Sequence, residues 1–166
     1  MAARVARPLL LTLTKGGHIF PRISGGPQVS GDGPTVRSVF MKAKRRFTDD
    51  TIDAIRDGKI LGIRAGTQPH RFIGIWAVVV ERRVFVRSWS LKPRSWYRTF
   101  LEEPRGTINV HGREIHVRAV RTRSERLKAA VSQAYLEKYN TPGSIKYARD
   151  MGRAKSRATT MELVPL

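Results

Sequence analysis

The chain of 166 residues has no cysteine, few acidic residues and no hydrophobic run long enough to cross a membrane. The absence of cysteine excludes disulfides, thiolate nucleophiles and thiolate metal sites, and it leaves the redox compartment open. Only 13 acidic residues face 32 lysines and arginines, which gives a net charge of +19 and a field that attracts anions. We therefore expect a cytoplasmic protein without a membrane span, whose partner is a nucleic acid, an acidic membrane surface or a phosphorylated cofactor.

The usual patterns of catalytic residues are also missing. The adjacent Asp49 and Asp50 suit the first turn of a helix, because the helix dipole favours acids there, and they point in different directions. No glycine-rich phosphate-binding loop occurs. The histidines lack the spacing of a metal site and stand apart, at His18, His70, His111 and His116. If the protein is an enzyme, a cofactor must supply the reactivity.

The first forty residues differ in composition from the rest of the chain. They are rich in glycine and proline, show no sustained period, and contain Asp32 as their single acid. A basic leader poor in acids is closer to an organellar transit peptide than to a secretory signal. We favour a different explanation, a start of translation at Met41. Residues 1–40 are then a flexible leader or a misassigned start, and residues 41–166 form one domain.

Local signals predict helices at both ends of this domain. Thr48 is a good N-cap for a short helix over 49–57, which Gly58 ends. Ser124 begins a long helix that runs to about residue 139, and 144–151 favours one or two further helical turns. Residues 59–64 and 159–164 favour strands, the last one pairing with an edge of a barrel. The long helix has one apolar stripe, best explained as core packing: Leu127, Val131, Tyr135 and Tyr139.

The middle of the chain favours two β-hairpins separated by a short helix. Apolar residues over 72–80 and an alternating run over 84–90 flank the break at 81–83, which predicts the first hairpin. Residues 93–101 favour helical turns that end before Pro104. Residues 106–120 favour strand, turn and strand, with the turn at His111 and Gly112. Strands with a short helix at the rim indicate a small barrel.

Basic, hydroxyl and aromatic side chains cluster where the second of these strands ends. Cations and hydroxyls bind a phosphate, and flat side chains accept a flat ring. A structural alternative remains, because Trp96 and Phe100 are i and i+4 neighbours and could form the apolar face of a helix that covers the barrel end. The cluster comprises Arg87, Ser88, Ser90, Lys92, Arg94 and Arg98, beside Trp89, Trp96 and Tyr97.

Residues 48–164 contain four short motifs, at Trp76–Val80, Val84–Ser88, Trp96–Arg98 and Ala134–Tyr139. In these motifs the chain resembles an uncharacterised bacterial family, domain-of-unknown-function family 2255. The central block is also similar to the deazaflavin-dependent nitroreductases and, more distantly, to the pyridoxamine-phosphate-oxidase-like proteins. The rim of the cofactor site in those proteins is matched here by Ser90, Pro93, Trp96, Tyr97, Glu103 and Pro104.

The resemblance implies a fold and a cofactor. The fold is α+β and mainly β: a split β-barrel of about six strands, like the FMN-binding barrel, with a short N-terminal helix and a long C-terminal one. It implies FMN or a deazaflavin, oxidoreduction, and a homodimer with the cofactor at the interface. The loop over 66–71 keeps one glycine and one cation of the deazaflavin enzymes' loop and loses the rest. Because a fold can persist after its ligand has changed, a barrel without any cofactor is the alternative.

The same resemblance assigns roles to single residues. The phosphate would be held by Arg71, Arg87, Ser88 and Lys92. Trp96 or Trp89 would flank the ring, and Tyr97 or Arg98 would tune or face its reacting edge.

The second hypothesis is a non-enzymatic protein that binds nucleic acid. Its electrostatic basis is the sequence pI of about 11.5 and the arginines around 113–126 and 149–157. No helix-turn-helix, zinc finger or RNA-recognition pattern is present. Such binding would be non-specific and would weaken steeply with salt.

Overall fold

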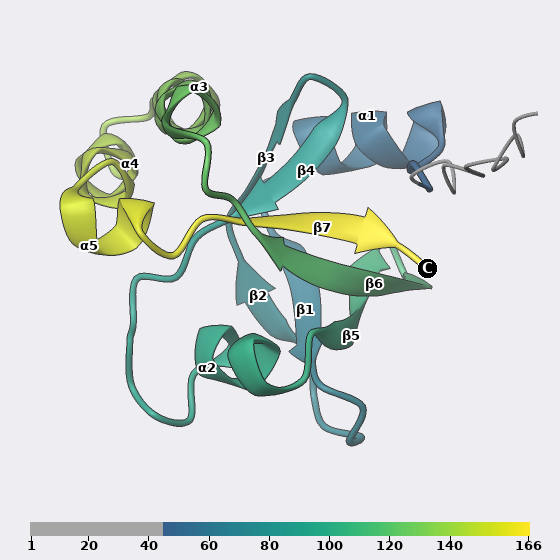
Figure 1. The fold of residues 1–166 in the computed structure, drawn as a ribbon. Helices are drawn as coiled ribbons and strands as arrows, with labels where there is room; N and C mark the ends of the chain where they lie inside the picture. The colour runs from purple at the N-terminus through teal and green to yellow at the C-terminus, as the bar shows by residue number, and fades with distance from the viewer. Residues whose placement is uncertain (1–44) are drawn as a thin grey trace, which may run out of the picture. The chain divides into compact units, whose positions relative to one another are not determined.

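The computed structural model describes residues 45–166, so the predictions for residues 1–40 and for a start at Met41 lie outside the described part. This part forms seven strands and five helices (Figure 1). Their bounds are α1 Asp49–Asp57, β1 Leu61–Ala65, β2 Ile73–Ile75, β3 Ala77–Val80, β4 Arg83–Val86, α2 Trp96–Glu102, β5 Arg105–Val110, β6 Arg113–Arg121, α3 Glu125–Lys138, α4 Ile145–Met151, α5 Ala154–Arg157 and β7 Met161–Pro165.

The strands form a single sheet in the order β2-β1-β5-β6-β7-β4-β3, with antiparallel pairing throughout. The two end strands, β2 and β3, are joined in the chain by a single residue, Trp76. Because one residue cannot span an open sheet, the ends of the sheet must meet there, and the sheet closes into a barrel with a split at Trp76. The predicted α+β split barrel is therefore confirmed, with seven strands.

Two expectations about the strands are wrong. The apolar run over 72–80 is not one strand, since it breaks at Trp76 into β2 and β3, which pair with different partners. The last strand does not pair with a barrel edge, because β7 lies between β6 and β4 and joins them. The hairpin turn itself is confirmed. Glu81 and Arg82 both have positive φ, 50° and 57°, as a type I′ turn requires.

Two hydrophobic cores hold the barrel. The first fills its interior with alternate strand residues such as Ile63, Val84 and Ile108, each fully buried. Helix α1 adds Ile52 and Ile55 to this core. Its predicted caps are confirmed, since the Thr48 side chain accepts from the N–H of Thr51 and Gly58 ends the helix.

The second core lies outside the barrel, where α3 covers the β3–β4 hairpin and α4 packs beside α3 (Figure 1). Val78 and Phe85 point outward into it from the two strands. The apolar stripe of the long helix faces them and is buried, as the sequence predicts. The outer faces of β5 and β6 are different, because their outward side chains Arg105, His116 and Arg118 are exposed.

Candidate functional site

The site forms at the split of the barrel, where strand pairing gives way to bonds from side chains. The Tyr135 hydroxyl donates to the carbonyl of Trp76 at 3.1 Å and accepts from the N–H of Arg87 at 3.1 Å. The Tyr139 hydroxyl accepts from the N–H of Ala77 at 3.2 Å. Burial raises the pKa of Tyr135, and it raises the pKa of Tyr139 to about 12. Both hydroxyls therefore stay neutral and satisfy main-chain groups that the sheet leaves unpaired.

A cavity of about 450 Å³, hereafter the aromatic cavity, opens beside this split. Its walls come from β2, from the segment after β4, from the start of α2 and from α4. The lining combines rings, apolar side chains and hydroxyls: Trp76, Trp89, Trp96 and Tyr147; Ile60, Ile73, Ile75 and Met151; Ser88, Ser90 and Ser95; with Gly74 and Arg87. It is thus an apolar cavity with a few polar groups, the usual character of a ligand site.

The rings of the aromatic cavity are held by other rings. Trp76 stacks on Tyr139, with centroids 4.0 Å apart and planes 4° apart. Tyr147 meets Trp89 edge to face at 5.0 Å. Trp96 contacts Phe100 edge to face at 6.1 Å, which is the helical i and i+4 pair of the structural alternative. Trp96 therefore packs on the core and faces the cavity, whereas Trp89 is 49% exposed.

The structure brings together part of the predicted set of site residues. Ser88, Ser90 and Trp96 line the aromatic cavity. Ser88 and Ser90 also shape the turn that follows β4, because the Ser88 hydroxyl donates to the Ser90 carbonyl at 2.6 Å. Lys92 lines an adjoining cavity of about 600 Å³, together with Trp89, Ser90 and Lys155.

The remaining predicted residues lie elsewhere. Tyr97 is buried in the barrel core, with its ring edge to face against Trp96 at 6.3 Å. Arg71 and Arg98 are exposed and belong to neither cavity lining. A phosphate in the aromatic cavity would thus have few cations beside it.

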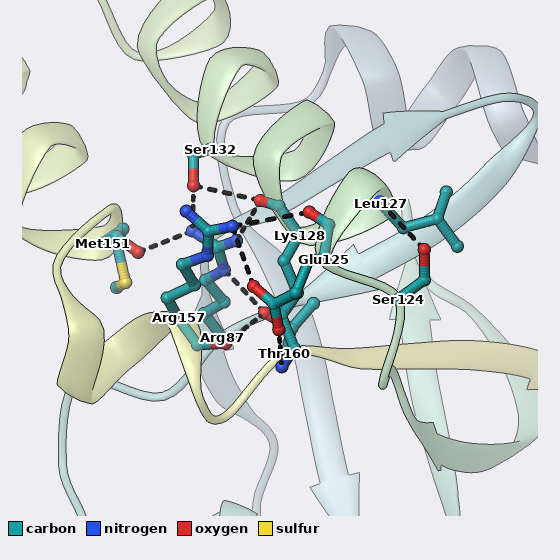
Figure 2. A network of polar contacts seen from close by, with 9 residues as sticks. All are labelled: Arg87, Ser124, Glu125, Leu127, Lys128, Ser132, Met151, Arg157 and Thr160. Carbon is teal, nitrogen blue, oxygen red and sulfur yellow. Dashed lines mark hydrogen bonds and ion pairs between the residues drawn. The ribbon is translucent and has the colours of Figure 1, made fainter.

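Arg87 borders the cavity, but its guanidinium serves the fold. Nε donates to the Thr160 hydroxyl at 2.9 Å, Nη1 to the Ser132 hydroxyl at 2.9 Å and to the Met151 carbonyl at 2.6 Å, and Nη2 to the Lys128 carbonyl at 2.6 Å (Figure 2). Four of its five N–H groups are thus engaged. Burial lowers the pKa of Arg87 to about 10. This geometry does not support the expectation that Arg87 holds a phosphate.

Sequence reasoning missed several lining residues. Tyr147 lies in a short helix that the sequence predicts without a role, and Ile73 and Ile75 belong to a run interpreted as one continuous strand. The sequence does contain a signal for Trp76, because a tryptophan in the middle of an apolar run suits a position where strand pairing breaks. At such a break the large indole has room to turn outward. Among the described residues, no group of histidines and acids has the arrangement of a metal site, and no helix could span a bilayer.

The model of a protein family matches residues 49–163, nearly the whole described part of the chain, and its description is "Uncharacterized protein conserved in bacteria (DUF2255)". The chain belongs to the DUF2255 family. The resemblance to this family is thereby confirmed. Its description names no activity, so the function of this DUF2255 protein must be inferred from its site.

Two solved structures are similar to this DUF2255 protein. The conserved hypothetical protein Rv2991 from Mycobacterium tuberculosis has 13% identity and a TM-score of 0.46, with 75% of this chain and 83% of that chain covered. A putative pyridoxamine 5'-phosphate oxidase from Listeria innocua has 8% identity and a TM-score of 0.46, with 71% and 90% covered. No curated protein matches the sequence.

Proposed function

We propose that the aromatic cavity binds the flat ring of a phosphorylated cofactor, FMN or a deazaflavin, and that the protein acts in oxidoreduction. The observation that carries this proposal is the cavity itself, about 450 Å³ in volume and walled by three tryptophans from three separate segments. Cavities of roughly 300 to 1,000 Å³ with mostly apolar walls are typical of small-molecule sites. Aromatic walls at fixed positions favour a planar ligand, because ring faces stack on ring faces.

The residues of the cavity fit such a ring. Trp96 and Trp89 would flank it, and Tyr97 supports Trp96 from the core. Ser88 and Ser90 supply hydroxyls for the polar edge of the ring. Among the described residues, this lining includes no carboxylate and no imidazole. A bound flavin or deazaflavin would supply the electron or hydride transfer, while the protein would bind and orient it.

The phosphate of the cofactor would lie toward the adjoining cavity. Trp89 and Ser90 line both cavities, so the two are neighbours. Lys92 and Lys155 are the cations of the second one, and ammonium groups bind phosphate through charge-assisted hydrogen bonds. Arg71 and Arg98 lie outside both linings, and we assign them a longer-range attraction for the anion.

We also expect a homodimer. Ile60 and Ile73 line the aromatic cavity and are 60% and 40% exposed, which is unusual for large aliphatic residues at the mouth of a site. A second copy that covers them would close the cavity. Analytical ultracentrifugation of the wild type and of Ile73→Glu should show a dimer and a monomer, respectively, and a monomeric wild type would contradict this expectation.

The test of the cofactor proposal is ligand-dependent thermal stability. At a ligand concentration one hundred times Kd, binding adds about 2.7 kcal/mol, which raises Tm by roughly 5–10 °C in a chain of this size. We expect this rise with FMN or a deazaflavin cofactor, and a smaller one with riboflavin, which lacks the phosphate.

Two variants locate the ligand. Trp96→Leu should reduce the rise in Tm for all three ligands, because it removes an indole that would stack on their shared ring. Lys92→Gln should reduce the rise only for the phosphorylated ligands. Arg123→Gln is the control for charge, because Arg123 is exposed and lines neither cavity. A protein that purifies without flavin absorbance and gains no stability from any of the three ligands would refute the proposal.

Nucleic acid remains the second candidate, and one observation favours it. Within residues 45–166, no ion pair engages several exposed arginines, namely Arg94, Arg98, Arg105, Arg118, Arg121 and Arg123. Duplex DNA of arbitrary sequence should then bind with an affinity that decreases steeply as salt rises. Binding of one sequence that resists salt would contradict a non-specific role.

A further inference from the structure

A separate cavity of about 280 Å³ lies where β1 ends and β5 begins. It shares no lining residue with the aromatic cavity. We call it the arginine cavity, after two of the residues around it. Its polar lining comprises Arg64, Thr67, Arg105, Thr107 and His116, and Leu166 also lines it.

The register of the sheet places the four of these side chains that belong to strands on one face. Arg64 of β1 lies opposite Thr107 of β5, and Thr107 lies opposite His116 of β6. Two positions along, Arg105 lies directly opposite Arg118. Like charges in directly opposite positions destabilise a sheet. Arg118 does not line the cavity, but an anion bound there beside Arg105 would reduce that repulsion.

Arg64 and His116 are held in place with donors to spare. Arg64 Nη2 is bound to the Glu114 carboxylate at 2.9 Å, and the guanidinium lies 4.5 Å from the centre of the Phe72 ring. His116 Nδ1 shares a hydrogen bond of 3.3 Å with the Thr107 hydroxyl, which leaves Nε2 for a ligand.

Arg105 completes the set of cations. Within the described part of the chain, its guanidinium has neither an ion pair nor a hydrogen-bond partner. It is therefore the side chain most free to bind an anion that enters the cavity.

The backbone around the cavity is rigid. Gly66 has φ of +80°, and its N–H donates to the Arg105 carbonyl at 2.8 Å. The His70 ring contacts the carbonyls of Ala65 at 3.0 Å and Arg71 at 2.8 Å, and thus braces the loop after β1. Arg64 and His116 are oriented before any ligand arrives, which lowers the entropic cost of their part in binding, whereas Arg105 is ordered by the ligand.

We infer that the arginine cavity is a binding site for a phosphoryl group. At about 280 Å³ it is smaller than cavities that enclose a whole cofactor, so it suits the anionic end of a ligand. Two guanidiniums, a hydroxyl and an imidazole face it from three strands, and three terminal oxygens of a phosphoryl group match them better than the two of a carboxylate. The site is independent of the proposed cofactor.

The test is titration of the full chain with inorganic phosphate, at an ionic strength held constant with chloride. Calorimetry should give a saturable signal with one site, and amide resonances near residues 64–67, 105–107 and 116 should shift. A nucleoside 5'-monophosphate and its unphosphorylated nucleoside identify the source of the group. Tighter binding of the monophosphate assigns the site to an organic phosphate, and equal binding assigns it to free phosphate. No saturable binding of either phosphate overturns the inference.

Matched variants separate the site from the general positive field. Arg105→Gln should weaken phosphate binding at least tenfold, and its exposed side chain makes loss of the fold no concern. Arg123→Gln removes the same charge from a position outside the cavity and should change affinity less than twofold. Equal losses in the two variants would show only diffuse attraction, as for a nucleic-acid surface, and would overturn the inference. His116→Asn is a second variant that keeps both arginines. It should also weaken phosphate binding, because it removes the imidazole from the cavity.

Discussion

The buried arginine offers the sharpest test of how this fold is held together. Replacing Arg87 by methionine keeps an unbranched chain of similar shape and removes the guanidinium. The hydroxyls of Ser132 and Thr160 keep other partners, since they donate to the carbonyls of Lys128 at 3.0 Å and Arg157 at 2.7 Å. The Met151 carbonyl, at the end of α4, loses the bond from Nη1.

These contacts set the magnitude. An orphaned buried carbonyl costs about 1–3 kcal/mol, and hydrogen bonds from a charged donor contribute about 1.5–3 kcal/mol each. The variant recovers part of this loss, because burying the guanidinium has its own desolvation cost. We expect Arg87→Met to lower the free energy of unfolding by about 2–4 kcal/mol. With a urea m-value of about 1–3 kcal/mol/M, the midpoint moves down by roughly 1–2 M.

Urea unfolding followed by circular dichroism measures this change. Arg87→Lys should lose at least as much, because an ammonium keeps the buried charge but cannot reach four acceptors in different directions. Arg121→Met, an exposed position at the end of a strand, should stay within about 0.5 kcal/mol of the wild type. If Arg87→Met unfolds at the midpoint of the wild type with an unchanged slope, the reasoning about Arg87 is wrong.

Three further predictions concern the same framework. Tyr139→Phe should lower the free energy of unfolding by about 1–2 kcal/mol in urea titrations, because the N–H of Ala77 loses its partner, and a loss below about 0.3 kcal/mol would contradict this. Burial lowers the pKa of Lys138 from 10.5 to about 8. Between these two pH values the unfolded chain therefore binds more protons than the folded chain. The free energy of unfolding of the wild type should rise with pH across this window, relative to that of Lys138→Met. The rise should be roughly 1–2 kcal/mol, because the amine is only half-buried and solvent screens part of the effect. If the difference in the free energy of unfolding between the two proteins does not change with pH, this prediction is wrong. Gly106→Ala should cost about 2–3 kcal/mol, since a Cβ there would lie 2.5 Å from the Arg64 carbonyl, whereas Gly143→Ala in open space should be nearly neutral in the same assay.

The elements of this fold that follow local rules are visible in the sequence. Thr48 and Ser124 each accept a hydrogen bond in the first turn of the helix that follows, as their cap positions predict. His111 and Gly112, both with positive φ, form the turn expected between the last two long strands. Such signals need only neighbours in the chain, so the caps, turns and helix stripes could be predicted.

The split of the barrel could not be predicted, because it depends on partners far away in the sequence. The break after Ile75 is stabilised by a hydroxyl that comes 59 residues after Trp76, on a helix whose stripe indicates only core packing. The position of Arg87 has the same cause. Its acceptors lie 41 to 73 residues further along, and sequence alone cannot distinguish an arginine that binds them from one that faces a ligand.

These two long-range features explain why a cavity exists at this end of the barrel. In a closed barrel, the main chain at Trp76 and Arg87 would pair with a neighbouring strand, and side chains would fill the interior. Here the Tyr135 hydroxyl bridges the two main chains, because it accepts from the N–H of Arg87 and donates to the carbonyl of Trp76, each at 3.1 Å. Trp76 and Ser88, one from each segment, both line the aromatic cavity beside this bridge. The tyrosine hydroxyl therefore takes the place of strand pairing at this point, and the cavity that we propose as the ligand site lies beside it.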